Sequence, residues 1–243
     1  MKTVMIIQAR MGSSRLPGKI LADLAGAPLL ARCVERAKRS YLVDETVIAT
    51  TEARKDDVVE RLCRQHGWAC FRGAEDDVLD RYQQAAVKYQ AEVVVRVTSD
   101  CPLIDPDLID RAIISFSDSH PRADYASNFW PRRSFPRGLD VEVFSAETLA
   151  RAWRMDRNPA LREHVPEYVL RHPELFRLKG IQMRRGFAWH RWTVDTAEDL
   201  ELVRRIYAHF GNDRFTWREV LKAFGEHPEW AEINGQVRQK QVV

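Results

Sequence analysis

The sequence lacks an excess of charge of one sign and any long hydrophobic run. Its 243 residues carry 38 Lys and Arg against 35 Asp and Glu, a formal net charge of +3. No dense basic stripe with interleaved aromatic residues stands out, which argues against a dedicated nucleic-acid-binding protein. No apolar run approaches the roughly 18–20 residues that span a bilayer, and no segment before the first predicted strand resembles a signal peptide. We therefore expect a cytoplasmic protein with no nucleic-acid or membrane partner.

Cysteine is also scarce, and two common nucleotide-binding signatures are missing. The four cysteines form no CxxC pair and no paired zinc-ligand spacing, so we expect reduced thiols. Gly12 and Gly18 bracket five residues and Lys19 is followed by Ile20, which does not fit a Walker A loop. No GxGxxG motif follows the first predicted strand. Any nucleotide site must therefore use another loop.

Strand and helix patterns alternate along the first hundred residues. Short apolar runs, rich in β-branched side chains, predict strands at 3–7, 45–50, 68–71 and 92–98. Helical spacing of apolar residues predicts helices at 28–39, 55–66 and 78–89. This order predicts an open, doubly wound α/β fold with a mainly parallel sheet.

The pattern loosens after Asp105 but contains further elements. Strands are predicted at 140–144, 177–183 and 190–194, and helices at 146–155, 161–171 and 198–210. One more short helix is predicted after Gly211, before a polar tail. There is no internal repeat, low-complexity tract or linker, so residues 1–243 are predicted to form one domain.

A basic, glycine-containing loop, "QARMGSSRLPGK", follows the first predicted strand. Arg10, Arg15 and Lys19 supply positive charge, and nearby backbone amides can form an anion-binding nest. The amides in question belong to Gly12, Ser13 and Ser14. A triphosphate would suit such a site, whereas the alternative is a solvated loop whose basic side chains contact nothing.

Two aspartates follow predicted strands at the edge where open α/β sheets bind ligands. Asp100 comes after the strand at 92–98, and Asp195 comes after 190–194 and just before a helix. With the basic loop, these carboxylates could converge on Mg²⁺ that bridges phosphates. The alternative is local: Asp100 could cap a turn, and Asp195 could cap the following helix.

Three motifs in order, "IIQARMGSSRLPGKIL", "RVTSDCPLIDP" and "TVDTAEDL", resemble the cytidylyltransferase family that includes 3-deoxy-manno-octulosonate and acylneuraminate cytidylyltransferases. "RGAEDDVLDRY", "YASN", "PRGLDVEVF" and "REHV" are similar to the branch of spore coat polysaccharide biosynthesis proteins. The resemblance covers about residues 1–205 and implies a three-layer, Rossmann-like nucleotide-diphospho-sugar transferase sandwich with a small dimerisation and acceptor-binding elaboration. It implies transfer of CMP from CTP to an acidic sugar, release of pyrophosphate, Mg²⁺ as cofactor and a homodimer.

The resemblance also implies roles for individual residues and for parts of the chain. The residues implied to carry catalysis are Arg10, Lys19, Asp100 and Asp195, of which the two aspartates are the metal ligands. The nucleotide-binding residues are Ala9, Arg10, Gly12, Ser13, Ser14, Arg15, Lys19 and Asp77. The acceptor-binding residues are Asn128, Arg137, Asp140, Glu142 and His164. Residues 1–120 would bind the nucleotide, 121–210 the acceptor and second metal ligand, and 211–243 would form a C-terminal helix and tail.

The acceptor segment departs from that of the octulosonate enzymes, so its substrate stays open. Its arginines at 132, 133 and 137 could clamp a carboxylate or phosphate, and Asp140 and Glu142, at alternate positions of one strand, would share a face. A solvated hairpin is the alternative. No general base is named, because a bound metal can lower the pKa of the attacking hydroxyl and so remove the need for one. Lone histidines such as His164 and His190 are more often structural.

Three classes of function remain at this point. The first is the cytidylyltransferase. The second is a nucleotidyltransferase with a phosphorylated acceptor, or a glycosyltransferase of the same fold. "EDD" at 75–77 would be the metal motif of a glycosyltransferase, but that stretch lies where a helix begins and fits N-terminal capping acids. The third is a non-catalytic nucleotide-binding subunit.

Overall fold

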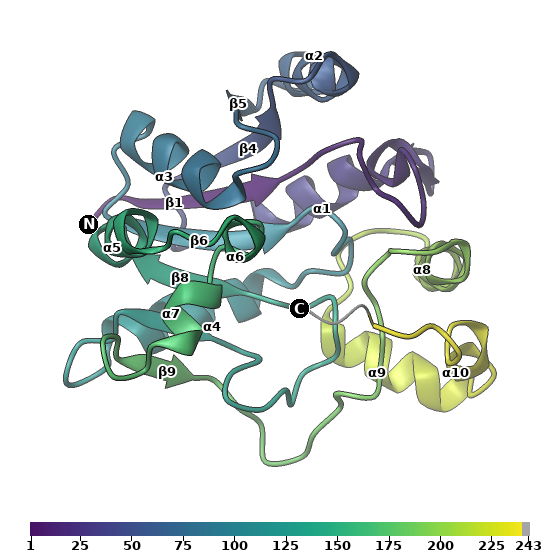
Figure 1. The fold of residues 1–243 in the computed structure, drawn as a ribbon. Coiled ribbons are helices and arrows are strands. Elements are labelled where there is room, and N and C mark those ends of the chain that lie inside the picture. Colours follow the sequence, from purple (N-terminus) through teal and green to yellow (C-terminus); the bar gives the residue numbers. More distant parts are fainter. Residues whose placement is uncertain (240–243) are drawn as a thin grey trace.

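Within residues 1–239, which the computed structural model describes, one seven-stranded sheet forms the centre of the molecule (Figure 1). From one edge to the other its strands are β5 (Ala69–Gly73), β4 (Glu45–Thr51), β1 (Thr3–Gln8), β6 (Val93–Thr98), β8 (Glu142–Ser145), β7 (Tyr125–Ser127) and β9 (Leu178–Gly180). Only β8 runs against its neighbours, β6 and β7. The mainly parallel sheet confirms the predicted fold class.

Helices cover both faces of this sheet and extend beyond one end of it. They are α1 (Leu29–Ala37), α2 (Asp57–His66), α3 (Val78–Lys88), α4 (Pro106–Ser117), α5 (Ala146–Met155), α6 (Pro159–Arg162), α7 (Glu167–Arg171), α8 (Ala197–Phe210), α9 (Trp217–Glu226) and α10 (Trp230–Ile233). Two 3₁₀ turns, η1 (Lys19–Leu21) and η2 (Arg54–Asp56), and a small hairpin of β2 (Asp23–Leu24) with β3 (Ala27–Pro28) complete the described elements. None of the helices in residues 1–239 is long and apolar enough to cross a membrane.

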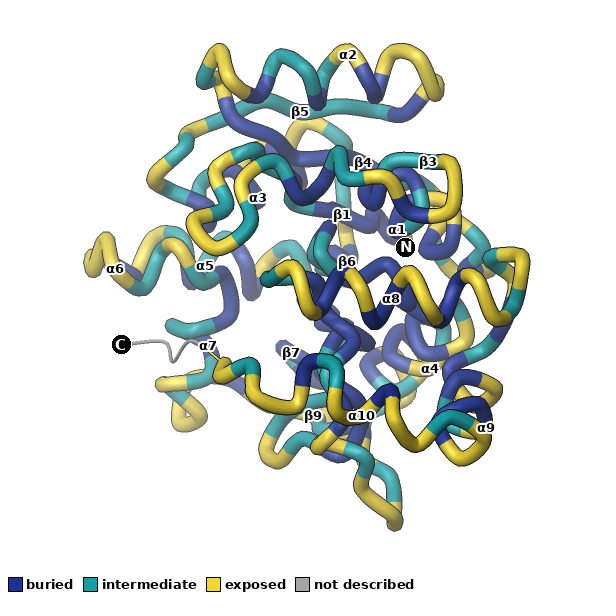
Figure 2. Tube along the Cα trace, turned by 90° about the vertical axis from the view of Figure 1, so that its right-hand side faces the viewer, coloured by how far each residue is buried: buried dark blue, intermediate teal, exposed yellow. Residues whose placement is uncertain are grey.

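Two hydrophobic cores form because successive side chains of a strand point to opposite faces. In β1, Met5 and Ile7 belong to the core that α1, α4, α8 and α9 cover, whereas Val4 and Ile6 belong to the core under α3, α5 and α7. Along α8, buried and exposed residues alternate with the helical period, as Figure 2 shows. The result is a three-layer sandwich.

Some elements differ from the sequence-based expectation. The helix predicted at 161–171 is two short helices, because Pro166 lacks the N–H that a continuous helix needs. Helix α4 was not predicted, although Pro106 at its first turn and an Asp105 cap are start signals. The segment after Gly211 holds two helices rather than one, and the last part of the predicted tail, 240–243, lies outside the described residues.

Residues 190–194, predicted as a strand, do not pair with any strand of the sheet. Trp192 and Val194 are fully buried, which produces the alternating pattern of a strand. Their amides, however, donate to two different segments: Trp192 to the Arg137 carbonyl at 2.7 Å and Val194 to the Asp100 carbonyl at 2.8 Å. The segment is therefore a tightly held irregular connection, and the prediction of a strand there was wrong.

Candidate active site

A cavity of about 480 Å³ lies at the carboxyl ends of β1 and β6 and gathers most of the residues that the sequence singled out. The predicted residues in its lining are Ala9, Arg10, Gly12, Ser13, Ser14, Arg15, Lys19, Asp100, Arg137, Asp140, His164 and Asp195. Parallel strands bring these distant segments together because their carboxyl ends share one edge of the sheet. Asp77, Asn128 and Glu142 lie outside this lining.

The loop after β1 is anchored by a buried carboxylate. Asp56, which is fully buried, accepts a hydrogen bond from the Met11 amide at 2.6 Å and another from the Thr51 hydroxyl. Gly18 has a φ of 70°, which L side chains rarely adopt, and it leads directly into the 3₁₀ turn that begins at Lys19. These contacts fix the start and the end of the loop at the cavity.

The loop backbone corrects the predicted nest in two details. The Ser13 amide already donates to the Met11 carbonyl at 2.9 Å, so it is committed within the loop. Gly12 does not have a positive φ, and a Cβ there would meet only side-chain ends, the nearest at 3.5 Å. Within residues 1–239 the amides of Gly12 and Ser14 donate no hydrogen bond to another backbone group, which leaves them for an anion.

Lys19 lies between the two predicted metal ligands. Its Nζ donates to Asp100 Oδ2 at 3.0 Å, to Asp195 Oδ1 at 2.8 Å and to the Val194 carbonyl at 2.7 Å, and the side chain is only 10% exposed. Burial alone would lower the pKa of Lys19, but the two carboxylates outweigh it and raise the pKa. For Asp100, burial would raise the pKa, whereas the Lys19 ammonium and the Thr98 hydroxyl lower it. Lys19 and Asp100 therefore form an ion pair that is charged at neutral pH.

Both carboxylate oxygens of Asp195 contact cations: Oδ1 contacts Lys19, and Oδ2 contacts two arginines. Oδ2 accepts a hydrogen bond from Arg191 and forms an ion pair with Arg15, each at 2.8 Å. The following helix is capped by Thr196, so capping does not account for Asp195. Arg10, at the other side of the loop, pairs with Glu163 at 2.7 Å. The three basic side chains of the loop are thus each paired with a protein carboxylate.

The segment 133–140 lines another part of the cavity, with a fixed ion pair and an arginine whose side chain donates no hydrogen bond to the described residues. Arg133 binds both carboxylate oxygens of Asp140, one of them at 2.8 Å. Arg137 lines the cavity, and burial together with the neighbouring Arg133 lowers its pKa. Gly138, with a φ of 100°, packs so closely that a Cβ would lie 2.5 Å from the Thr193 amide. This close approach holds the arginine segment against the Asp195 segment.

A family model described as "Cytidylyltransferase" matches residues 4–225 of the chain. The chain belongs to the cytidylyltransferase family. The spore coat polysaccharide biosynthesis protein SpsF of Bacillus subtilis is 36% identical over 213 residues, 85% of this chain and 86% of that protein. The 3-deoxy-manno-octulosonate cytidylyltransferase of Chlorobaculum tepidum is 32% identical over 215 residues, 85% of each. A solved cytidylyltransferase of Leptospira borgpetersenii superposes with a TM-score of 0.91 at 33% identity and covers 99% of this chain and 100% of its own.

These matches confirm the resemblance that the motifs indicated. The protein is an enzyme, a cytidylyltransferase, in a family that acts on sugar-like substrates. The individual roles assigned to its residues remain predictions, and the cavity shows which of them have a place at the site.

Two of the acceptor residues predicted for this cytidylyltransferase are buried structural groups. Asn128 donates to the Leu139 carbonyl at 2.6 Å and accepts from the Val141 amide at 3.0 Å, so both ends of its amide are used by the backbone. Glu142, 1% exposed, binds the Arg96 guanidinium and the Tyr125 hydroxyl. Asp140 lies before β8 begins, so it does not share a strand face with Glu142. The prediction that both acids face the acceptor was wrong for Glu142.

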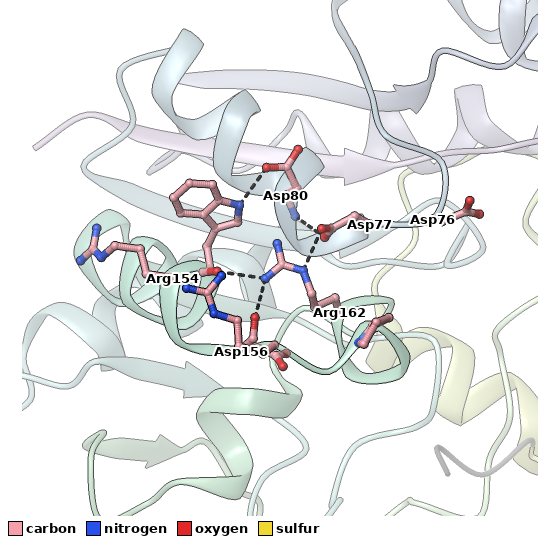
Figure 3. A pocket seen from close by; sticks show the side chains of 9 residues that line it. Asp76, Asp77, Asp80, Arg154, Asp156 and Arg162 are labelled. Atoms are coloured by element: carbon pink, nitrogen blue, oxygen red, sulfur yellow. Dashed lines mark hydrogen bonds and ion pairs between the residues drawn. The ribbon is translucent and has the colours of Figure 1, made fainter.

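Asp77 lies in a second cavity, of about 660 Å³, between α3 and the α5–α6 segment (Figure 3). Its Oδ1 caps α3 by accepting from the Asp80 amide at 2.8 Å, and its Oδ2 pairs with Arg162 at 2.7 Å. In Figure 3 the Arg162 and Asp77 side chains point toward one another. The capping interpretation of residues 75–77 is therefore confirmed for Asp77, and its assignment to the nucleotide pocket is not supported.

The two histidines have different surroundings. His164 lines the active-site cavity and is half-buried. His190 is buried among aromatic rings, with Trp189 stacked on it at 3.5 Å and Phe224 edge-on at 4.5 Å, and burial lowers its pKa to about 4. A neutral ring in an aromatic cluster fits a structural role for His190.

Sequence reasoning did not assign several residues that line the cavity. They are Gln8, Arg81, Arg96, Thr98, Ser99, Phe129, Glu163, Thr193 and Gln239. Arg96 carried a usable signal, since a charged residue inside the run "VVVRV" must find a buried partner. Gln239 had no such signal, because its place depends on how the C-terminal segment folds back.

Proposed function

We propose that this cytidylyltransferase transfers CMP from CTP to an acidic sugar, releases pyrophosphate, and uses Mg²⁺ held by Asp100 and Asp195. The observation that carries the proposal is the convergence of these carboxylates on one cation, the Lys19 ammonium, at 3.0 and 2.8 Å. Mg²⁺ in nucleotide sites usually takes one or two carboxylates and completes its shell with phosphate oxygens and water. In residues 1–239 no three Asp, Glu, His or Cys side chains form a metal-binding group, which fits a metal that arrives with the nucleotide.

The basic loop is suited to the charge that develops in this reaction. A sugar hydroxyl attacks the α-phosphorus and gives up its proton to solvent, the new O–P bond forms, and pyrophosphate leaves with the electrons of the bond that breaks. Arg10, Arg15 and Lys19 can then exchange their present carboxylate partners for phosphate oxygens. Donors on the phosphate oxygens stabilise the charge that develops on the leaving pyrophosphate more than the ground state. Mg²⁺, when bound, supplies further charge neutralisation and lowers the pKa of the attacking hydroxyl.

Arg137 supports an acidic acceptor. Its guanidinium lines the cavity opposite the basic loop without a hydrogen bond to the described residues, and an arginine fork matches a carboxylate well. Asp140, held by Arg133, can accept hydrogen bonds from sugar hydroxyls at the same wall. The name of the Chlorobaculum tepidum relative, a 3-deoxy-manno-octulosonate cytidylyltransferase, is consistent with a sugar acid.

Substrate screening tests the reaction. Pyrophosphate release is measured with each of the four nucleoside triphosphates and Mg²⁺ against acidic sugars, matched neutral sugars and sugar phosphates. We expect activity with CTP and an acidic sugar only. Activity confined to sugar phosphates would contradict the acceptor class, and hydrolysis of a ready-made nucleotide sugar would favour a glycosyltransferase.

Charge-neutral variants test the metal site. Asp100→Asn and Asp195→Asn should abolish turnover and Mn²⁺ binding in calorimetry while the protein stays folded, because each removes a ligand charge at nearly constant volume. Asp118→Asn, an exposed aspartate outside the cavity, is the control. Near wild-type rates for both cavity variants at saturating Mg²⁺ would show that the metal assignment is wrong.

The homodimer that the resemblance implies and the cytoplasmic location expected from the sequence belong to the same proposal. Light scattering of the purified chain gives its mass in solution, and a monomer at micromolar concentration would contradict the dimer. Fractionation of the native cells tests the location.

A further inference from the structure

The C-terminal segment reaches the active site, although it lies beyond the residues that match the family model. That match ends at residue 225. Figure 1 shows α9 and α10 beside α8, at the end of the sheet to which β1 points. After α10, Asn234 is buried, at 6% exposure, and Gln239 lines the active-site cavity. The segment after the family match is thus in contact with the residues that surround Asp195.

Asn234 uses both hydrogens of its side-chain amide on this network. Nδ2 donates to the Arg191 carbonyl at 2.9 Å and to Asp199 Oδ1 at 2.8 Å. Both partners accept, so the nitrogen of the amide must face them. Asn234 therefore connects α10 to the turn that precedes α8.

Asp199 and Arg191 in turn fix the position of Asp195. The Asp199 carboxylate, which is fully buried, accepts from Arg191 Nε at 2.9 Å and from the Asp195 amide at 2.9 Å. Arg191 also donates to Asp195 Oδ2 at 2.8 Å, and its Nη1 donates to Gln239 at 2.5 Å. Asp195 is thus held through its backbone and through its side chain by the two residues that Asn234 and Gln239 contact.

We propose that Asn234 is a positioning residue for metal and nucleotide binding, which acts through Asp199 and Arg191 on the Asp195 carboxylate. The inference rests on the proposed function of Asp195 as a metal ligand. Without the Asn234 amide, Asp199 Oδ1 keeps one donor instead of two, and the Arg191 segment loses its link to α10. The Asp195 carboxylate then has more freedom to leave the orientation that it shares with Asp100.

Asn234→Leu, which has a similar size and no donor, tests this inference in the full chain. Mn²⁺ affinity is measured by calorimetry with a non-reactive CTP analogue, together with KM for CTP, kcat and Tm. Removal of a group that orients a metal ligand usually weakens metal binding by about 10–100-fold, and for Asn234, one contact further away, we expect about three- to tenfold. KM for CTP should rise by a similar factor. Glu232→Gln, on the exposed side of α10, is the matched control and should equal the wild type.

A merely structural role predicts a lower Tm with unchanged Mn²⁺ affinity and KM, and that result would overturn the inference. If Asn234→Leu does not fold, Asn234→Ser, whose hydroxyl is too short to reach both acceptors, takes its place with the same criteria. Asp195→Asn separates the two proposals. If it loses Mn²⁺ binding while the Asn234 variant keeps wild-type affinity, only the positioning role fails; if it binds Mn²⁺ normally, the proposed metal site fails and the positioning role with it.

Discussion

Replacing Lys19 by methionine is the most direct perturbation of the site. The Lys19 ammonium makes three hydrogen bonds of 3.0 Å or less in a position that is 10% exposed, and two of the acceptors are the candidate metal ligands. Lys19→Met keeps most of the side-chain volume and removes the charge. The variant therefore removes the proposed phosphate donor and, at the same time, the cation that pairs with Asp100 and Asp195.

Lys19→Met should lower both the turnover rate and the folding stability, for separate reasons. Removal of one preorganised donor to a developing anion costs about 10²–10³ in turnover, or roughly 3–4 kcal/mol. Breaking a buried ion pair costs up to about 3–5 kcal/mol of folding stability. Asp100 loses its only ion-pair partner in the described residues, so we expect a measurable loss of stability. We place that loss in the lower part of the range because Asp195 keeps Arg15 and Arg191.

Two assays follow from this. Pyrophosphate release gives kcat and KM, and thermal melts with and without Mn²⁺ give the stability of the free protein. Because Lys19 no longer occupies the two carboxylates, Mn²⁺ without nucleotide should raise the Tm of the variant more than that of the wild type. Lys38→Met, at an exposed position, controls for the loss of one positive charge. Wild-type turnover of Lys19→Met would refute the proposed role of the loop.

Three further predictions address the acceptor, the buried ion pair and pH. Arg137→Ala should raise KM for the acidic acceptor by tenfold or more, on the order of 1.4 kcal/mol or above, and leave KM for CTP unchanged; equal effects on both would contradict an acceptor role. Glu142→Gln should lower the free energy of unfolding by about 3–5 kcal/mol, because it leaves the buried Arg96 without its carboxylate, and chemical denaturation measures it; an unchanged midpoint would disprove the structural role. The folded-state pKa of His190 is lowered to about 4 by burial, so its contribution to stability is complete above the unfolded pKa near 6.5 and is lost as pH falls toward 4. Melts across this range should show that loss in the wild type and a smaller one in His190→Phe.

The alternation of apolar strands and amphipathic helices in residues 1–105 predicted that part of the fold closely. Strands such as 92–98 are buried on both faces, so their composition alone separates them from the neighbouring helices. Prediction was weaker at 190–194, where alternating apolar residues reflect burial but the backbone does not join the sheet. It also failed at 106–117, where the start signals were present but the preceding segment did not suggest a new helix.

The sequence predicted that the basic loop and Asp100 come together at one edge of the sheet, and the structure shows them there. A loop after the first strand and an aspartate after β6 must lie at the same edge of a parallel sheet. Three predicted site residues lie outside the cavity lining: Asp77, Asn128 and Glu142. Each forms a hydrogen bond or ion pair with a segment that only the folded chain brings near. A polar side chain in a sequence motif looks the same whether it faces a ligand or a buried partner.

The sequence by itself determined which residues could form the site. The basic loop, the two aspartates and the family motifs are recognised from residue type and order along the chain. The tertiary structure decided the pairings. Lys19 meets Asp100 and Asp195 across more than 80 residues of chain, and Asn234 meets Asp199 because α10 folds back onto the turn before α8. Such contacts depend on the packing of whole elements, and packing is set by the sum of many weak apolar contacts rather than by any local pattern.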